Sequence, residues 1–181
     1  MLWGATFYAI STNLAYIVRT ATDGDPVRMS RLLAIGGFAV VFGRFIFGYL
    51  LDVMNPALVA VTLFSMCMVF LALDAWGQNY EMLLIAAFIS GLVGGGESDL
   101  MPYLAGRAFG QRSLSKVLGL FFLAFFMGAA IGPISFAQAS QAFGGTTTPL
   151  LFLCAMQLVP ITIFVRLASR HEFRPDRLKY I

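Results

Sequence analysis

Three ionisable side chains, Arg44, Glu97 and Asp99, lie inside long apolar stretches of the 181-residue sequence. A charge near the centre of a membrane costs at least ~2.5–3.5 kcal/mol, so such residues pair with one another or bind a solute or proton. Glu97 and Asp99 are two residues apart, which turns them about 200° from each other on a helix. We therefore expect Arg44 to pair with one acid while the other, which we expect to be Glu97, faces a cavity. Two interpretations stay open: an ion-pair clasp between helices, or substrate and proton coupling.

Other reactive residue types form no catalytic or metal-binding pattern. The cysteines, Cys67 and Cys154, lie in different apolar stretches, and the single histidine, His171, lies in a charged C-terminal segment. Without a Ser–His–Asp or Cys–His arrangement or a GK[ST] phosphate loop, the sequence predicts no enzyme, no cofactor, no metal site and no ATP-driven pump. Asp74 and Glu81 lie at the ends of apolar stretches, where we expect them at the membrane interface.

The elements that position these residues are six apolar stretches. The chain is 59% hydrophobic and 12% charged, with a mean hydropathy of +0.82, which excludes a soluble domain. A net charge of +3 without a basic block also excludes a nucleic-acid-binding module. Each stretch has about the 20 residues that a helix needs to cross a bilayer. We predict an all-α integral membrane protein whose six transmembrane helices cover Leu2–Val18, Leu32–Leu51, Ala57–Ala75, Met82–Tyr103, Val117–Gln138 and Pro149–Ala168.

The orientation is predicted from the distribution of basic residues. With both termini in the cytoplasm, the inner loops and a basic tail at 169–181 hold eight basic residues, and the outer loops hold three. Cytoplasmic loops are enriched in lysine and arginine, so this topology is favoured. We expect the protein to lie in the plasma membrane. The eight are Arg107, Arg112, Lys116, Arg166, Arg170, Arg174, Arg177 and Lys179, and the three are Arg19, Arg28 and Arg31.

Glycines stand at helix-packing intervals in two of the stretches. The second contains GRFIFGYLLD, with Gly43 and Gly48, and the fifth contains MGAAIGP, with Gly128, Gly132 and Pro133. Small residues let helix backbones approach closely. Because the motifs occupy matching places in two groups of three stretches, we predict inverted repeats over 1–75 and 82–168. The triple glycine Gly94–Gly96 is expected to loosen its helix.

Two segments resemble a known transporter family. GGGESDLMPYLAGRAFGQRSLSKVLGLFFLAFFMGAAIGP (Gly94–Pro133) resembles helices ten and eleven of major facilitator superfamily transporters, particularly the branch of monocarboxylate and oxalate–formate carriers, and GRFIFGYLLD is similar to a motif of the superfamily. The resemblance implies that the chain is the C-terminal six-helix half of a twelve-helix carrier. It also implies a cytoplasmic gate in which Asp52 engages Arg107. Val53, Met54 and Asn55 replace the basic residues that usually follow the aspartate, and the fifth stretch lacks the lysine expected of an oxalate carrier.

The repeat pattern and the resemblance together predict secondary active transport of a small organic solute by alternating access, and the resemblance implies a monocarboxylate-like anion. The coupling residues would be Glu97, Asp99 and Arg44, with Asn13 and Tyr16 from the polar face of the first stretch. The partners would be the lipid bilayer, the solute and a second six-helix half. The alternative is a non-transporting packing subunit or a truncated remnant of a carrier.

Overall fold

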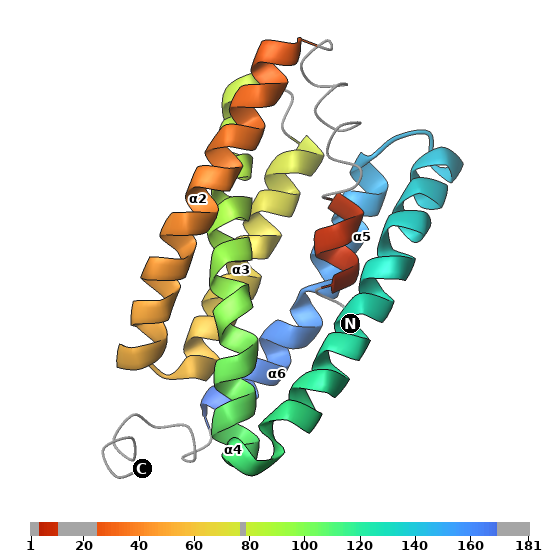
Figure 1. Cartoon of the computed structure of the whole chain (residues 1–181). Helices are drawn as coiled ribbons and strands as arrows, with labels where there is room; N and C mark the ends of the chain where they lie inside the picture. The colour runs from red at the N-terminus through yellow and green to blue at the C-terminus, as the bar shows by residue number, and fades with distance from the viewer. Residues whose placement is uncertain (1–3, 11–24, 77–78, 170–181) are drawn as a thin grey trace.

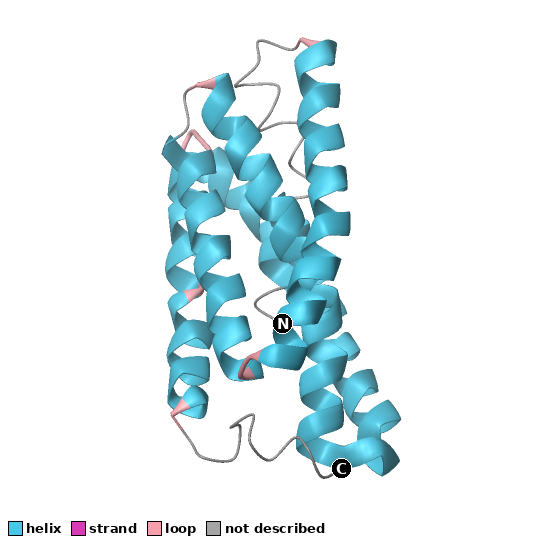
Figure 2. Cartoon of the chain, turned by 90° about the vertical axis from the view of Figure 1, so that its left-hand side faces the viewer, coloured by secondary structure: helices cyan, strands magenta, loops and turns pink. Residues whose placement is uncertain are grey.

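Residues 4–10, 25–76 and 79–169 are described by the computed structural model, and they form helices joined by short turns, with no strand in these ranges (Figures 1 and 2). Residues 4–10 are helical. The elements that follow are α2 (Pro26–Val53), α3 (Pro56–Trp76), α4 (Tyr80–Ala142), α5 (Thr147–Met156) and α6 (Leu158–Ala168). The predicted all-helical class is confirmed.

Five segments of the described chain are long and apolar enough to cross a membrane. They are Pro26–Val53, Pro56–Trp76, Tyr80–Gly110, Arg112–Ala142 and Thr147–Ala168. Five of the six predicted spans therefore appear as helices. Of the first predicted span only residues 4–10 are described, and the predicted tail lies, apart from Ser169, outside the described residues.

The helix boundaries follow from local capping. α2 starts earlier than predicted because the Asp25 side chain accepts a hydrogen bond from the Val27 amide, 2.9 Å away, and Pro26 occupies the first turn. Between α2 and α3 the buried Asn55 acts the same way, since its Oδ1 accepts from the Ala57 amide at 3.0 Å. α2 and α3 are therefore joined by a tight turn. Asn55, one of the departures from the family motif, caps the start of α3 in this turn.

α4 consists of two membrane-spanning arms, Tyr80–Gly110 and Arg112–Ala142. The arms meet at Gly110, whose φ of 71° and ψ of 169° are the non-helical angles inside α4. Glycine adopts a positive φ without strain, so it makes this corner possible. Pro102 and Pro133 lie within the arms, where the backbone stays helical. The first arm and α2 start at the same end of the bundle, and the second arm returns toward it (Figure 1).

The arms and the other helices enclose a core of leucine, valine and small residues. α2 and α3 pack on the first arm, α5 and α6 pack on α3, and residues 4–10 lie beside the second arm (Figure 1). Leu63, Leu71, Val93 and Leu150 are fully buried. Large apolar side chains also cover the outer surface, such as Phe45 at 75% exposed. An outer surface this apolar suits a hydrocarbon environment.

Candidate functional site

The charged residues of the predicted site are positioned by a close contact between α2 and the first arm of α4. A Cβ atom built on Gly43 would meet the backbone of Leu92, and one on Gly95 would meet the backbones of Val40 and Arg44. A Cβ on Gly91 would lie 2.7 Å from the Cβ of Ala39. Gly91 and Gly95 form a G-x-x-x-G pattern, which was visible in the sequence but which the prediction did not use.

Arg44 lies beside this contact with its side chain exposed. Gly43 faces Leu92, and the next residue of a helix is turned about 100°, so the guanidinium leaves the interface. On α4 the same geometry separates the two acids. Asp99 follows Gly95 by one turn and shares its face, whereas Glu97 is turned about 200° away from α2. Glu97 therefore lies on the face between Gly94, which contacts Phe7, and Gly96, which contacts Phe47 and Leu63.

The expected ion pair between Arg44 and one of these acids is not formed in this structure. Among residues 4–10, 25–76 and 79–169, the structure contains one ion pair between side chains, which joins Arg28 to Asp25 at 3.5 Å. The orientation of Arg44 away from the helix contact explains its absence. Asn13 and Tyr16, the other predicted coupling residues, lie outside the described residues.

The glycines Gly94–Gly96 pack closely and do not loosen the helix as predicted. Backbone angles stay helical through this segment. Gly95 and Gly96 are buried, the first against α2 and the second against the side chains of Phe47 and Leu63. The missing side chains therefore serve close helix contact, and the neighbouring acids stand on a rigid element.

The predicted gate residues are also separate in this structure. Asp52 is exposed on the last turn of α2, one position after the buried Leu51, so it is turned away from the core. Arg107 is partly buried near the Gly110 corner, and its Nη1 is buried with no hydrogen-bond partner in the described chain. Asp52 and Arg107 form no ion pair among the described residues.

The other predicted packing residues differ in their surroundings. A Cβ on Gly132 would meet the backbone of Ala5, so this glycine lies at a close contact between the second arm and residues 4–10. Gly128 is buried and lines a groove, and Pro133 is partly buried. Around Gly48, by contrast, nothing in the described chain comes within 4 Å of a built Cβ. Gly48 is thus not at a helix contact here.

A buried polar contact that the sequence prediction missed joins residues 4–10 to the last spanning segment. Gln157 is fully buried and its Nε2 donates a hydrogen bond to the Thr6 hydroxyl at 2.9 Å. Gln157 lies at the junction between α5 and α6, and its Oε1 has no hydrogen-bond partner in the described chain. A glutamine in the middle of an apolar stretch was the signal that could have identified this contact.

A cavity of about 200 Å³ lies between residues 4–10, α2, α3 and the first arm of α4. Its polar lining includes Asp74, Ser90 and Thr6, in otherwise largely apolar walls. Asp74 is partly buried and lies near the end of α3, so it contributes a carboxyl group to the wall of this cavity. No group of three or more histidine, cysteine, aspartate or glutamate side chains suited to a metal occurs within the described ranges.

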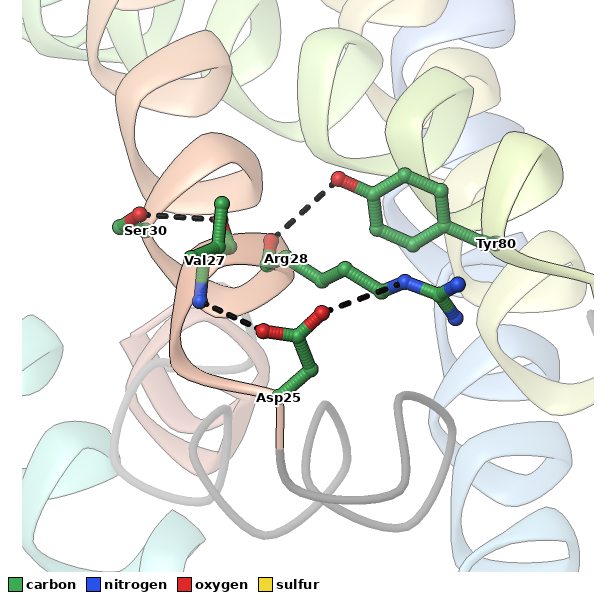
Figure 3. A network of polar contacts seen from close by, with 5 residues as sticks. All are labelled: Asp25, Val27, Arg28, Ser30 and Tyr80. Carbon is green, nitrogen blue, oxygen red and sulfur yellow. Dashed lines mark hydrogen bonds and ion pairs between the residues drawn. The ribbon is translucent and has the colours of Figure 1, made fainter.

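A polar network links the beginnings of α2 and α4 (Figure 3). Arg28 pairs with Asp25, and its guanidinium lies 5.4 Å from the centre of the Tyr80 ring. The Tyr80 hydroxyl donates to the carbonyl oxygen of Arg28 at 3.4 Å. About one turn further along the two helices, Leu32 packs against Leu83. The beginnings of α2 and α4 are thereby held together, and Arg28 has a defined structural partner.

The fold and the site define a class of protein: a multi-pass helical membrane protein with close glycine contacts and with charged residues inside its spans that form no ion pair with one another. The sequence matches the Major Facilitator Superfamily over residues 1–179. The chain therefore belongs to this superfamily of membrane transporters, which confirms the resemblance at the level of the superfamily. Comparison with curated proteins finds none that matches.

Proposed function

We propose that the protein takes part in secondary active transport of a small organic anion, of the monocarboxylate type, by alternating access. One observation carries the proposal: Arg44, Glu97 and Asp99 lie within membrane-spanning helices of a transporter-family protein and form no ion pair with one another. Charges that are costly in a membrane are retained where they bind a solute or a proton. The ion-pair clasp, the other interpretation of these residues, has no contact to support it in this structure.

Arg44 is the residue that we assign to the carboxylate of the solute. A guanidinium binds a carboxylate through two parallel hydrogen bonds, which fixes its orientation. The side chain of Arg44 is exposed beside the α2–α4 contact, so it is accessible from outside this bundle. In a carrier with two halves, the solute would bind between this surface and the second six-helix half.

Glu97 is the residue that we assign to proton coupling. It lies on the inner face of the first arm, turned away from Arg44, so a proton and an anion would occupy different positions. Carrying both together would leave no net charge to cross the membrane. Asp52 and Arg107 would pair when the cytoplasmic side is closed, since the buried Nη1 of Arg107 has no partner in this state.

Uptake by the purified full chain in liposomes tests the proposal. Radiolabelled formate and lactate would be offered with an inward proton gradient, and oxalate would serve as the dicarboxylate comparison. We expect Arg44→Gln to weaken solute binding by about 10- to 100-fold, from the ~1.5–3 kcal/mol of a hydrogen bond to a charged group. Arg44→Lys should retain part of the binding. Arg31→Gln is the matched control, because Arg31 is also exposed on α2 but lies near its beginning.

Glu97→Gln separates coupling from binding. The variant should lose the dependence of uptake on the proton gradient but still exchange solute across the membrane, whereas Asp99→Asn should keep the dependence. Normal transport by both variants over the whole pH range would exclude coupling through these acids. Uptake only after addition of a second six-helix chain would identify this chain as half of a carrier. A folded chain that transports nothing in either setting would support the alternative, a non-transporting packing subunit.

A further inference from the structure

A groove of about 500 Å³ runs between the second arm of α4 and α5, away from the charged residues of the proposed site. Its volume lies in the range of about 300–1,000 Å³ that is typical of ligand pockets. The lining side chains are apolar apart from two hydroxyl groups and carry no charge. They are Ala5, Gly128, Ile131, Gly132, Ser135, Phe136, Ala139, Phe143, Thr148, Pro149, Phe152, Leu153 and Met156.

The space in the groove is accessible from the lipid side of the bundle. Gly128 and Gly132 are buried where they line it, and the backbone of Ala5 lies against Gly132. Ile131, Phe143 and Phe152, which also line it, are 55%, 66% and 66% exposed. The groove therefore opens between these side chains onto the surface that faces hydrocarbon.

The groove has the length of one leaflet of a bilayer. On α4 it extends from Gly128, next to the midpoint of the Arg112–Ala142 arm, to Phe143 just beyond its end. On the last spanning segment it extends from Thr148, at the beginning, to Met156, near the midpoint. At 1.5 Å per residue these are lengths of about 22 and 12 Å, which bracket the ~15 Å of a single hydrocarbon leaflet. A spanning helix of a partner would need a groove through both leaflets.

The mouth of the groove suits a phosphate group. Thr148 lies in the first turn of α5, and the N-cap residue Thr146 makes no side-chain hydrogen bond to this helix end. The amide groups and positive dipole of a helix N-terminus favour a phosphate. The turn and first helical residues, FGGTTT at 143–148, contain neither a basic nor an acidic side chain. The mouth therefore offers uncharged donors and nothing that selects a net negative headgroup.

We propose that this groove binds one acyl chain of a zwitterionic phospholipid from the leaflet at the α4–α5 turn, with the lipid phosphate at the N-terminus of α5. The uncharged walls match the acyl chain, and the helix end matches the phosphate. The acyl chain fills the groove and supports the second arm against α5. This site is independent of the transport proposed above.

Native mass spectrometry of the full chain, released from bilayers of equimolar phosphatidylcholine, phosphatidylethanolamine and phosphatidylglycerol, tests the proposal. We expect one retained phospholipid per chain, without enrichment of the anionic phosphatidylglycerol. Ala139→Phe places a ring in the groove and should reduce retention at least fivefold. Ala130→Phe, on an exposed position of the same arm outside the groove, is the matched control and should leave retention unchanged.

Ser135→Leu is a second, smaller filling variant for the case in which Ala139→Phe does not fold. It should also reduce retention, and circular dichroism would check that each variant keeps its helices. Equal retention by the filling variants and the control would overturn the proposal. Displacement of the lipid by inorganic phosphate would overturn it too, because it would show that the acyl chain contributes little. Recovery of a second copy of the chain or a partner helix in place of the lipid would assign the groove to protein contact instead.

Discussion

Replacing Gly91 with alanine places a methyl group in the contact between α2 and the first arm of α4. The new Cβ would lie 2.7 Å from the Cβ of Ala39 and would also meet the carbonyl group of Gly36. Carbon atoms in contact normally lie about 3.5–4.0 Å apart. The two helices must therefore separate by about 1 Å, or the backbone must shift by a similar distance.

The expected cost of this change is that of overpacking a well-packed contact, about 1–3 kcal/mol of unfolding free energy. The matched control is Gly48→Ala on α2, where nothing in the described chain lies within 4 Å of the new Cβ. At this position the higher helix propensity of alanine should leave the stability unchanged or raise it by up to about 1 kcal/mol. The difference between the two variants is therefore the informative quantity.

The difference in stability between the two variants can be measured by unfolding them in mixed micelles. The micelles contain dodecyl maltoside and increasing amounts of sodium dodecyl sulfate, and circular dichroism follows the loss of helix. We expect the midpoint of the Gly91→Ala protein to fall clearly below that of the Gly48→Ala protein. If the two midpoints coincide, the helices do not approach each other as closely as described, and the explanation given for the exposed position of Arg44 loses its basis.

Three further predictions concern other contacts. Thr6→Val should destabilise the protein by about 1–3 kcal/mol, because the Gln157 amide loses its partner, and a double-mutant cycle with Gln157→Leu should show coupling between the two positions. Asp25→Ala should cost about 0.5–2 kcal/mol through the lost cap of α2, whereas Asp25→Asn, which keeps a capping oxygen but loses the charge that pairs with Arg28, should cost less in the same unfolding assay in mixed micelles. Reporter fusions after Tyr180 and within residues 21–30 should report opposite sides of the membrane, with the first in the cytoplasm; signals from one side would refute the six-span topology.

Much of the fold is predictable from the sequence because a spanning helix needs an apolar stretch of defined length. The positions at which helices begin depend on single residues, so the apolar pattern placed the start of α2 at Leu32, while the Asp25 cap and Pro26 extend it to residue 26. The corner at Gly110 was not predicted, since one glycine in a polar segment does not reveal its positive φ.

The candidate site was only partly predictable. The location of Arg44, Glu97 and Asp99 inside long apolar helices follows from the hydropathy of the sequence, and the separation of the two acids follows from the helix period. Pairing across helices depends on rotation about each axis, which Gly43 and Gly95 fix through close contacts between two segments far apart in the sequence. The same limit explains why Gly94–Gly96 were expected to be loose: a run of glycines looks alike in sequence whether its surface is open or packed.

We expect the Gly110 corner to affect how the chain enters the membrane during synthesis. Two apolar arms joined by a tight corner are suited to partition into lipid together as one helical hairpin rather than one after the other. Arg107, Arg112 and Lys116 flank the corner, and carrying three such charges through the hydrocarbon together would be far more costly than leaving them behind. We therefore expect the two arms to insert as a hairpin whose corner stays on the cytoplasmic side, where the ribosome is. The bend at Gly110 would then determine how these two helices insert as well as how they pack in the folded bundle.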